Sequence, residues 1–305
     1  MKRRTFLASV AALTAFPAVA RETRSFGGSA FGSYWRLTLA DSTTSGTAIV
    51  NSIVAEIDAL MSPYRVSDLS VFNATRSTDV LPLAPEVLEV AQSALSIAAE
   101  TEGAFDPTVG PLVGQLGFGP IRGEAGSFRE LEVSGTGLRK AAQRLTLDLC
   151  GIAKGHALDR IVAALEAEGN ANFLIDLGGE IAGRGRHPDG RPWRIGVEGA
   201  GSIAAIATLG GDAAATSGDA VQGYRLGGRR YGHIISPISD GGLASVTVFH
   251  ASARRADALA TALFAMGRDR AEEFARQRQI EAVLVPDAGV PVLTGGVGAR
   301  ILEHA

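Results

Sequence analysis

The chain has 305 residues, of which 46% are hydrophobic and 20% charged, enough apolar material for one large domain or two closely joined ones. Its formal net charge is −3, so it lacks the basic excess that a nucleic-acid-binding protein needs. Its single cysteine, Cys150, cannot form an internal disulfide, so stability must come from the packed core.

The first twenty residues have the pattern of an export signal. Basic residues precede a short apolar stretch that ends on Ala18-Val19-Ala20, a small-x-small pattern that signal peptidase accepts. Arg3-Arg4 followed by Phe6-Leu7 resembles the twin-arginine export signal, although the basic start of an ordinary secretory signal would have a similar form. The apolar stretch is too short to remain in a bilayer as an anchor. We therefore expect residues 1–20 to be a removed, twin-arginine-like signal peptide.

The mature domain would then comprise residues 21–305, free in the periplasm and without a membrane anchor. Removal of the signal takes Lys2, Arg3 and Arg4 from the 29 basic residues and leaves 26 against 32 acidic ones, a formal charge of −6. This acidic balance argues further against nucleic acid as a partner.

The N-terminal part of the mature chain is predicted to begin with a strand over residues 34–40, where apolar and polar residues alternate. A helix is predicted over residues 47–61, because its apolar residues recur at helical spacing and stop before a proline. A second helix is predicted within residues 85–103, with Pro85 in its first turn and Gly103 just past its end.

The remainder of the chain mixes strands with helices. A strand over residues 145–149 is predicted to run through Gly151 into a helix that ends at Gly169. Further strands are predicted over residues 172–180, 193–198, 203–211, 245–250 and 281–287, and helical segments over 253–263 and 268–279. The elements do not alternate strictly, which favours an α+β fold over a doubly wound parallel sheet. No repeat or linker interrupts the chain, so we expect one compact unit.

Two kinds of site have little support in the sequence. No loop ends in Gly-Lys-Ser/Thr, and no Gly-x-Gly-x-x-Gly opens a helix after a strand, which argues against nucleoside triphosphate sites and Rossmann-type sites. One cysteine and five scattered histidines argue against a structural zinc site.

An oxygen-rich metal site has better support in the helix predicted over residues 253–263. Asp257 and Thr261 are four residues apart there, so a carboxylate and a hydroxyl should project from one face. Such hard donors suit Mg²⁺ that is held jointly by protein and substrate phosphates. The alternative is that Asp257 caps the helix and Thr261 bonds to a carbonyl of the preceding turn.

Seven segments support a more specific prediction. They are SPYRVSDLSVFN (62–73), GAFDPTVGPLVGQLGFG (103–119), LDLCGIAKGHALD (147–159), LIDLGGEIAGRG (174–185), AATSGD (214–219), GHIISP (232–237) and ADALATAL (256–263). In order and spacing this set resembles the ApbE family of FAD:protein FMN transferases, and the resemblance covers nearly the whole mature chain. It implies an α+β fold, a compact ApbE-like (T-fold-like) unit in which mixed, largely antiparallel sheets pack with helices.

The resemblance also implies an activity. Members of the family cleave FAD and attach its FMN half, through a phosphoester bond, to a Thr or Ser hydroxyl of a target protein, with AMP leaving. FAD would be the substrate and Mg²⁺ the cofactor, and the partner would be a periplasm-facing flavoprotein subunit of an electron-transfer complex. Two alternatives stay open: an FAD pyrophosphatase, in which water replaces the protein hydroxyl, and a non-catalytic periplasmic FAD-binding or assembly protein.

Individual roles follow from the same resemblance. Asp257 and Thr261 would be side-chain ligands of Mg²⁺, with the main-chain carbonyl of Gly151 as a third ligand, and His233 and Asp257 would be catalytic. The residues that the resemblance places around FAD are Tyr64, Ala104, Phe105, Asp106, Lys154, Thr216, Ser217 and His233.

Physical reasoning leaves alternatives open at several of these residues. Lys154 lies at the start of a predicted helix and opposes the helix dipole unless an anion is bound, which favours a phosphate contact. Tyr64 would stack on the flavin or adenine ring, or be an ordinary half-buried tyrosine. Asp106 would accept ribose hydroxyls or cap the turn that follows it. His233 would assist proton transfer, bond to a phosphate oxygen, or be structural.

Two positions depart from the family pattern. Ser236 stands where the family commonly has Asp; if that Asp positions His233 or the metal, this chain is slower or uses Asp240 instead. Phe31-Gly32-Ser33 stands where Met-Gly-Thr is usual, a milder change that keeps bulk, flexibility and a hydroxyl.

Overall fold

The computed structural model describes residues 22–40, 45–218, 223–226, 229–235 and 242–304. The expected signal peptide lies outside these residues, as do Ser236 and Asp240. Within the described ranges, no helix is long and apolar enough to cross a membrane.

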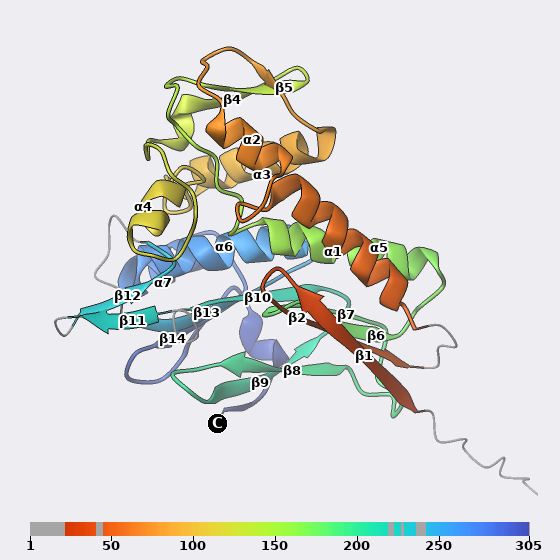
Figure 1. The fold of residues 1–305 in the computed structure, drawn as a ribbon. Coiled ribbons are helices and arrows are strands. Elements are labelled where there is room, and N and C mark those ends of the chain that lie inside the picture. The colour runs from red at the N-terminus through yellow and green to blue at the C-terminus, as the bar shows by residue number, and fades with distance from the viewer. Residues whose placement is uncertain (1–21, 41–44, 219–222, 227–228, 236–241, 305) are drawn as a thin grey trace, which may run out of the picture.

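An eight-stranded sheet forms the centre of the molecule (Figure 1). Every pair of neighbouring strands in it is antiparallel. In spatial order the strands are β1 (Thr23–Ala30), β2 (Ser33–Ala40), β6 (Phe173–Asp176), β7 (Glu180–Arg184), β10 (Ala213–Gly218), β13 (Leu243–His250), β14 (Ala282–Pro286) and β15 (Val292–Thr294). The expectation of largely antiparallel sheets in an α+β fold is therefore confirmed.

Helices cover one face of this sheet (Figure 1). They are α1 (Thr47–Met61), α5 (Ala153–Ala167), α6 (Ala253–Met266) and α7 (Arg268–Gln277). α6 packs on β10 and β13 and lies beside α5, which in turn contacts α1. The predicted helix over residues 47–61 is confirmed residue for residue, because its apolar stripe is buried against the sheet and the other helices.

A three-stranded sheet covers the opposite face of the main sheet. It comprises β8 (Trp193–Glu198), β9 (Ile203–Leu209) and β16 (Ile301–His304), with the 3₁₀ helix η2 (Val297–Arg300) before β16. Its Trp193 and Val197 share a core cluster with Phe249 and Val283 of the main sheet. Since both faces of the main sheet are covered, seven of the eight residues of β13 are buried.

A smaller layer packs over the helices (Figure 1). It holds α2 (Asp68–Ala74), α3 (Pro85–Glu100), α4 (Gly110–Gln115), the 3₁₀ helix η1 (Phe128–Glu130) and a sheet of β3 (Leu81–Pro82), β5 (Gly137–Lys140) and β4 (Leu131–Ser134). The hairpin of β11 (Gly223–Leu226) and β12 (Arg229–Gly232) forms a separate two-stranded sheet. The helix predicted to end just before Gly103 ends two residues earlier, at Glu100.

The strand predicted over residues 145–149 is wrong. Leu145, Leu147 and Leu149 are fully buried, but the segment belongs to no strand and forms only one isolated bridge, between Glu124 and Leu145. The side chain of Asn73 takes the place of a neighbouring strand: its Nδ2 donates to the Leu147 carbonyl and its Oδ1 accepts from the Leu147 N–H, both at 2.8 Å. The alternating leucines therefore belong to a segment that passes through the core without forming a strand.

Candidate active site

The candidate site is built where α5 and α6 cross. The N–H of Gly155, in the first turn of α5, donates to Oδ2 of Asp257 at 2.9 Å, and Asp257 is only 4% exposed. A Cβ at position 155 would lie 2.4 Å from the carbonyl oxygen of Ala253 in the first turn of α6, so only glycine allows this close contact. Ser252, and not Asp257, is the N-cap of α6, because its Oγ accepts from the Arg255 N–H. The helix-cap alternative for Asp257 is therefore wrong.

Thr261 lies one turn further along α6 and faces the turn before α5. A Cβ built at Gly151 would come within 3.2 Å of Thr261 Oγ1 and 3.1 Å of the Phe105 ring, so these three residues meet at one point. Thr261 Oγ1 also lies 3.2 Å from Ser217 Oγ at the end of β10. The structure therefore brings together the three predicted metal ligands, together with Phe105 and Ser217.

These donors fit Mg²⁺ better than a softer metal. No group of three or more His, Cys, Asp or Glu side chains that suits a metal ion occurs among the described residues. The site offers the carboxylate of Asp257 and the hydroxyl of Thr261, and a side chain at position 151 would crowd Thr261, so glycine keeps the main chain close to these donors. Hard oxygen donors in so small a number suit Mg²⁺, which commonly shares its ligands with water and substrate phosphates.

Lys154 forms a buried ion pair beside this point. Its Nζ lies 2.8 Å from Oε1 of Glu180, whose side chain is only 2% exposed, whereas that of Lys154 is 33% exposed. Burial raises the pKa of Glu180 to about 8; the positive charge of Lys154 opposes that rise, and the negative charge of Asp257 adds to it. Burial alone would lower the pKa of Lys154, but the carboxylates of Glu180 and Asp257 outweigh it and raise that pKa.

Asp257 carries a further perturbed pKa. Burial raises it, and the charge of Lys154 and the N–H of Gly155 oppose this rise. Oε2 of Glu180 is buried and has no hydrogen-bond partner within the described part of the chain. A buried carboxylate pair that shares one lysine is a typical arrangement at a functional site, because it holds charge ready for a ligand.

Glu180 was not identified from the sequence. Its sequence signal is weak, since it is a single acidic residue at the start of β7 after Gly178-Gly179. Asp148 was missed as well: Oδ1 accepts from the Cys150 N–H at 2.9 Å, and burial raises the pKa of this carboxyl. Its backbone N–H bonds to the carbonyl of Pro107, which ties the turn before α5 to the loop that carries Phe105.

Among the predicted FAD residues, Asp106 has partners that give it a structural role. Asp106 Oδ1 accepts from the N–H and hydroxyl of Thr108, and Oδ2 accepts from the N–H of Phe128 at 3.1 Å. The carboxylate thus caps the turn, and its contact with ribose stays a prediction. Ala104 and Phe105 beside it are buried.

Thr216 faces away from the crossing of the two helices. Its Oγ1 lies 2.9 Å from Oγ1 of Thr247, its register partner on β13. Successive side chains of a strand point to opposite faces, so Ser217 projects towards Thr261 and Thr216 towards the three-stranded sheet. Ser217 thus faces the predicted metal ligands and the side chain of Thr216 does not, and the contacts of both residues with FAD stay predictions.

Tyr64 and His233 lie along one side of the site and are linked by Phe118. Tyr64 is 71% exposed, and its hydroxyl donates to the Phe118 carbonyl at 3.2 Å. The Phe118 and His233 rings are 6.5 Å apart in an edge-to-face arrangement. Partial burial raises the pKa of Tyr64, and the nearby Cys150 and Asp148 add to this. A ring this exposed is not a half-buried tyrosine and is free to stack on a planar ligand.

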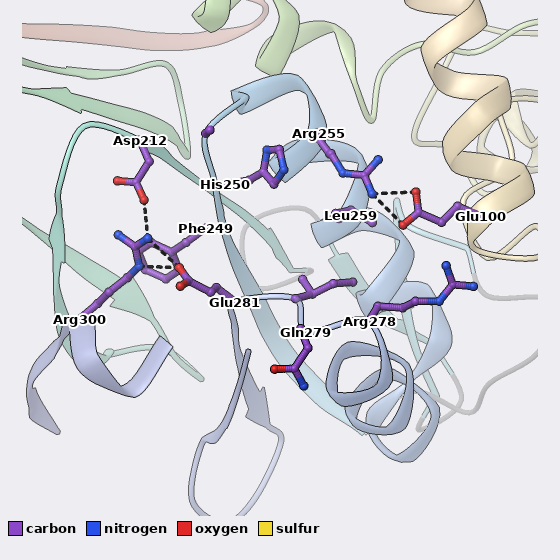
Figure 2. A pocket seen from close by; sticks show the side chains of 12 residues that line it. Glu100, Asp212, Phe249, His250, Arg255, Leu259, Arg278, Gln279, Glu281 and Arg300 are labelled. Atoms are coloured by element: carbon purple, nitrogen blue, oxygen red, sulfur yellow. Dashed lines mark hydrogen bonds and ion pairs between the residues drawn. The ribbon is translucent and has the colours of Figure 1, made fainter. Parts of the chain in front are cut away.

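Two surface cavities lie elsewhere. One, of about 470 Å³, has three arginines in its wall, and Figure 2 shows Arg255 paired with Glu100 and Arg300 paired with Asp212 and Glu281. The other, of about 560 Å³, lies over α3 and α5. Neither is lined by Lys154, Asp257 or Thr261, so neither is the candidate active site.

Comparison with known proteins gives a consistent result. An FAD:protein FMN transferase from Vibrio cholerae is 36% identical over 270 residues, which cover 81% of this chain and 80% of the relative. The enzyme of the same name from Salmonella typhimurium is 30% identical over 293 residues, covering 86% of this chain and 84% of the relative.

Solved structures agree with these sequence matches. The flavin transferase ApbE from Vibrio cholerae superposes with a TM-score of 0.83 at 30% identity, covering 92% of this chain and 99% of that one. The apo form of the flavinyl transferase ApbE from Pseudomonas stutzeri also gives a TM-score of 0.83 at 30% identity, covering 93% and 98%.

The sequence model of the ApbE family matches residues 31–284, nearly the whole of the described chain. The predicted family, its fold and its enzyme class, the FAD:protein FMN transferases, are thereby confirmed. The chain with Asp257, Thr261 and Lys154 at the crossing of α5 and α6 belongs to the ApbE family.

Proposed function

We propose that this FAD:protein FMN transferase moves FMN from FAD to a Thr or Ser hydroxyl of a target flavoprotein, in a Mg²⁺-dependent reaction that releases AMP. The observation that carries the proposal is the meeting of Asp257, Thr261 and Gly151 next to Lys154. One oxygen-rich point beside one cation is what a pyrophosphate linkage requires, since two neighbouring phosphates must be neutralised together.

Lys154 and the start of α5 would bind the pyrophosphate. The lysine lies in the first turn of the helix, where the helix dipole favours an anion. Its side chain is one-third exposed, so Nζ can turn from Glu180 towards a phosphate oxygen without leaving the site. Tyr64, exposed at the side of the site, would stack on one of the ring systems of FAD.

Asp257, Thr261 and the carbonyl of Gly151 would hold Mg²⁺. When bound, the ion supplies Lewis-acid stabilisation of the negative charge that develops on the phosphate oxygens. Gly155 orients Asp257 for this purpose, because its N–H occupies one carboxylate oxygen and leaves the other for the ion.

The transfer step needs a place for one proton. The oxygen of the target hydroxyl bonds to the phosphorus on the FMN side, the bond from that phosphorus to the bridging oxygen breaks, and AMP leaves with that oxygen. His233, half-buried beside Phe118, would take the proton of the attacking hydroxyl. The signal-like N-terminus supports the periplasm as the compartment and a periplasm-facing flavoprotein subunit as the target.

Intact-mass measurement tests this proposal. The chain over residues 21–305 is incubated with FAD, Mg²⁺ and an acceptor domain, and the acceptor should gain one FMN while AMP appears. EDTA should block the addition, and Asp257→Asn should lower the rate at least about 100-fold, as expected when a charged metal ligand is lost. Asp269→Asn, on the exposed first turn of α7, is the matched control. FMN and AMP accumulating without any acceptor modification would instead support the pyrophosphatase alternative.

A further inference from the structure

We infer that Asp159 is a positioning residue for the active site: it fixes the start of α6 and thereby sets where Asp257 and Thr261 lie relative to α5. This inference rests on the proposed function, since it concerns the same metal ligands. It is carried by hydrogen bonds between the two helices.

Asp159, in the second turn of α5, binds three groups at the start of α6. Its Oδ1 accepts from the N–H of Ala253 at 2.6 Å, and its Oδ2 accepts from the hydroxyl of Ser252 at 2.7 Å and the N–H of Arg254 at 3.1 Å. The first N–H groups of a helix have no acceptor within the helix, and a carboxylate there also complements the helix dipole. Asp159 therefore supplies, from 94 residues away in sequence, most of the cap of α6.

Asp257 of α6 makes the corresponding contact with the start of α5. α5 starts at Ala153 after Ile152, which has no side-chain cap, and the N–H of Gly155 in its first turn is bound by Asp257 of α6. Each helix start is thus bound by an aspartate of the other helix. The close approach at Gly155 places the two starts side by side. Two carboxylates therefore fix the alignment of α5 and α6, and only one of them is a predicted metal ligand.

The metal site depends on this alignment because its ligands come from both helices. Gly151 precedes α5, whereas Asp257 and Thr261 belong to α6. A site of this kind must be held within about 0.5 Å of its productive geometry. Asp159 itself lies on the outer side, in the wall of the cavity over α3 and α5, so its loss removes no predicted ligand.

The consequence is a selective effect on metal affinity. Without Asp159, the start of α6 loses three hydrogen bonds, and Asp257 is held in a wider range of positions. Metal binding should weaken about tenfold or more, in line with the effect of losing residues that orient metal ligands. The transfer rate at saturating Mg²⁺ should stay within about threefold of wild type, because every group that touches the substrate is still present.

Three variants distinguish the placement of α6 from the charge of Asp159 and from an effect on the stability of the fold. Asp159→Asn keeps the size but cannot accept all three hydrogen bonds. Ser252→Ala keeps the charge of Asp159 and removes its hydroxyl partner. Glu166→Gln is the matched control, since Glu166 is an exposed residue of the same helix that pairs with Arg184.

The experiment titrates Mn²⁺ into each mature protein in the presence of FAD and without acceptor, and follows the free ion by electron paramagnetic resonance. The inference expects the apparent Kd for Mn²⁺ to rise about tenfold or more in Asp159→Asn. A smaller rise is expected in Ser252→Ala and none in Glu166→Gln. Transfer activity as a function of Mg²⁺ concentration should show the same order, with similar maximal rates.

Three outcomes would overturn the inference. Unchanged Mn²⁺ affinity in both variants, with a lower Tm, would mean that Asp159 only stabilises the fold. Weaker binding in Asp159→Asn but not in Ser252→Ala would mean that its charge, and not its placement of α6, matters. Wild-type protein that binds no Mn²⁺ would refute the metal site of the proposed function itself, which distinguishes that failure from the first two.

Discussion

Lys154 is the residue that we propose to contact the pyrophosphate of FAD. In the structure its Nζ lies 2.8 Å from Oε1 of Glu180, and the carboxyl of Asp257 acts on it from further away. A pyrophosphate would compete with Glu180 for Nζ. Because the pKa of Glu180 is about 8, its carboxyl is protonated at neutral pH, so the loss of its contact with Lys154 leaves no buried charge uncompensated. The contact with Glu180 therefore holds Nζ of Lys154 in place until a phosphate arrives.

Replacing this lysine should weaken FAD binding. Lys154→Met keeps the length and removes the charge, and a charge-assisted hydrogen bond contributes about 1.5–3 kcal/mol, so we expect the KM for FAD to rise about 10- to 100-fold. The measurement is the FAD dependence of acceptor flavinylation. Arg139→Met, which removes an exposed cation paired with Glu132, is the control. An unchanged KM would contradict the phosphate contact.

At the scale of elements, the crossing of α5 and α6 decides the geometry of the site. The two helices touch at Gly155, where the main chain of α6 occupies the space of a side chain. A strand-end hydroxyl, that of Ser217, completes the contact from β10 below. The elements of the site are thus a pair of helix starts over the central strands of the main sheet.

Gly155→Ala should therefore be destabilising, although alanine is the better helix former. The added Cβ would lie 2.4 Å from the Ala253 carbonyl oxygen, and such overpacking costs about 1–3 kcal/mol, more than the gain of at most about 1 kcal/mol in helix propensity. Thermal unfolding followed by circular dichroism should show a lower Tm and a loss of activity. Gly119→Ala, where the new Cβ meets only Val113 at 3.5 Å, should leave Tm nearly unchanged. Equal Tm values for the two variants would refute the close helix contact.

The contact of Asn73, in α2, with the segment over residues 145–149 leads to a second prediction at this scale. Asn73→Ala would leave the N–H and the carbonyl of Leu147 buried without partners, and each unsatisfied group costs about 1–3 kcal/mol. We expect a clear decrease in the free energy of unfolding, measured by denaturant titration. Asn51→Ala removes one bond, from Nε1 of Trp35, and should cost less because a single group loses its partner. The reverse order would show that Asn73 does not hold the segment.

At the scale of the whole molecule, the buried carboxyl of Glu180 should make stability depend on pH. Its pKa is about 8 in the folded protein against an ordinary value of 4.5, so between these values the folded state holds a proton that the unfolded state lacks. Stability is then greatest at the low end of this window and falls as pH rises through 8. One proton gives a slope of at most about 1.4 kcal/mol per pH unit.

The comparison of wild type with Glu180→Gln isolates this contribution. Free energies of unfolding are measured for both metal-free proteins between pH 5.5 and 8.5, and the wild-type curve should fall more steeply with rising pH. The charge of Asp257 adds to the rise in the pKa of Glu180, so the difference between the two curves reports the titration of Glu180 together with its interaction with Asp257. Parallel curves would mean that Glu180 keeps an ordinary pKa in the fold.

Residue spacing along the sequence predicted some helices and strands correctly and one strand wrongly. Helical spacing located α1 and alternation located β8, because both signals report burial of one side of an element against a core. The segment over residues 145–149 misled the same reasoning. Its alternating leucines report burial correctly, but its backbone partner is the side chain of Asn73, which alternation cannot reveal.

The sequence by itself determined the family, the α+β class and the meeting of Asp257 with Thr261, because residues four apart on one helix share a face wherever that helix packs. Only the tertiary structure decided that Glu180 pairs with Lys154 and that Thr216 turns away from the site. It alone also placed Asp159 at the start of α6. These contacts join residues 26 to 94 positions apart, and their formation depends on how helices and strands pack, which local spacing does not encode.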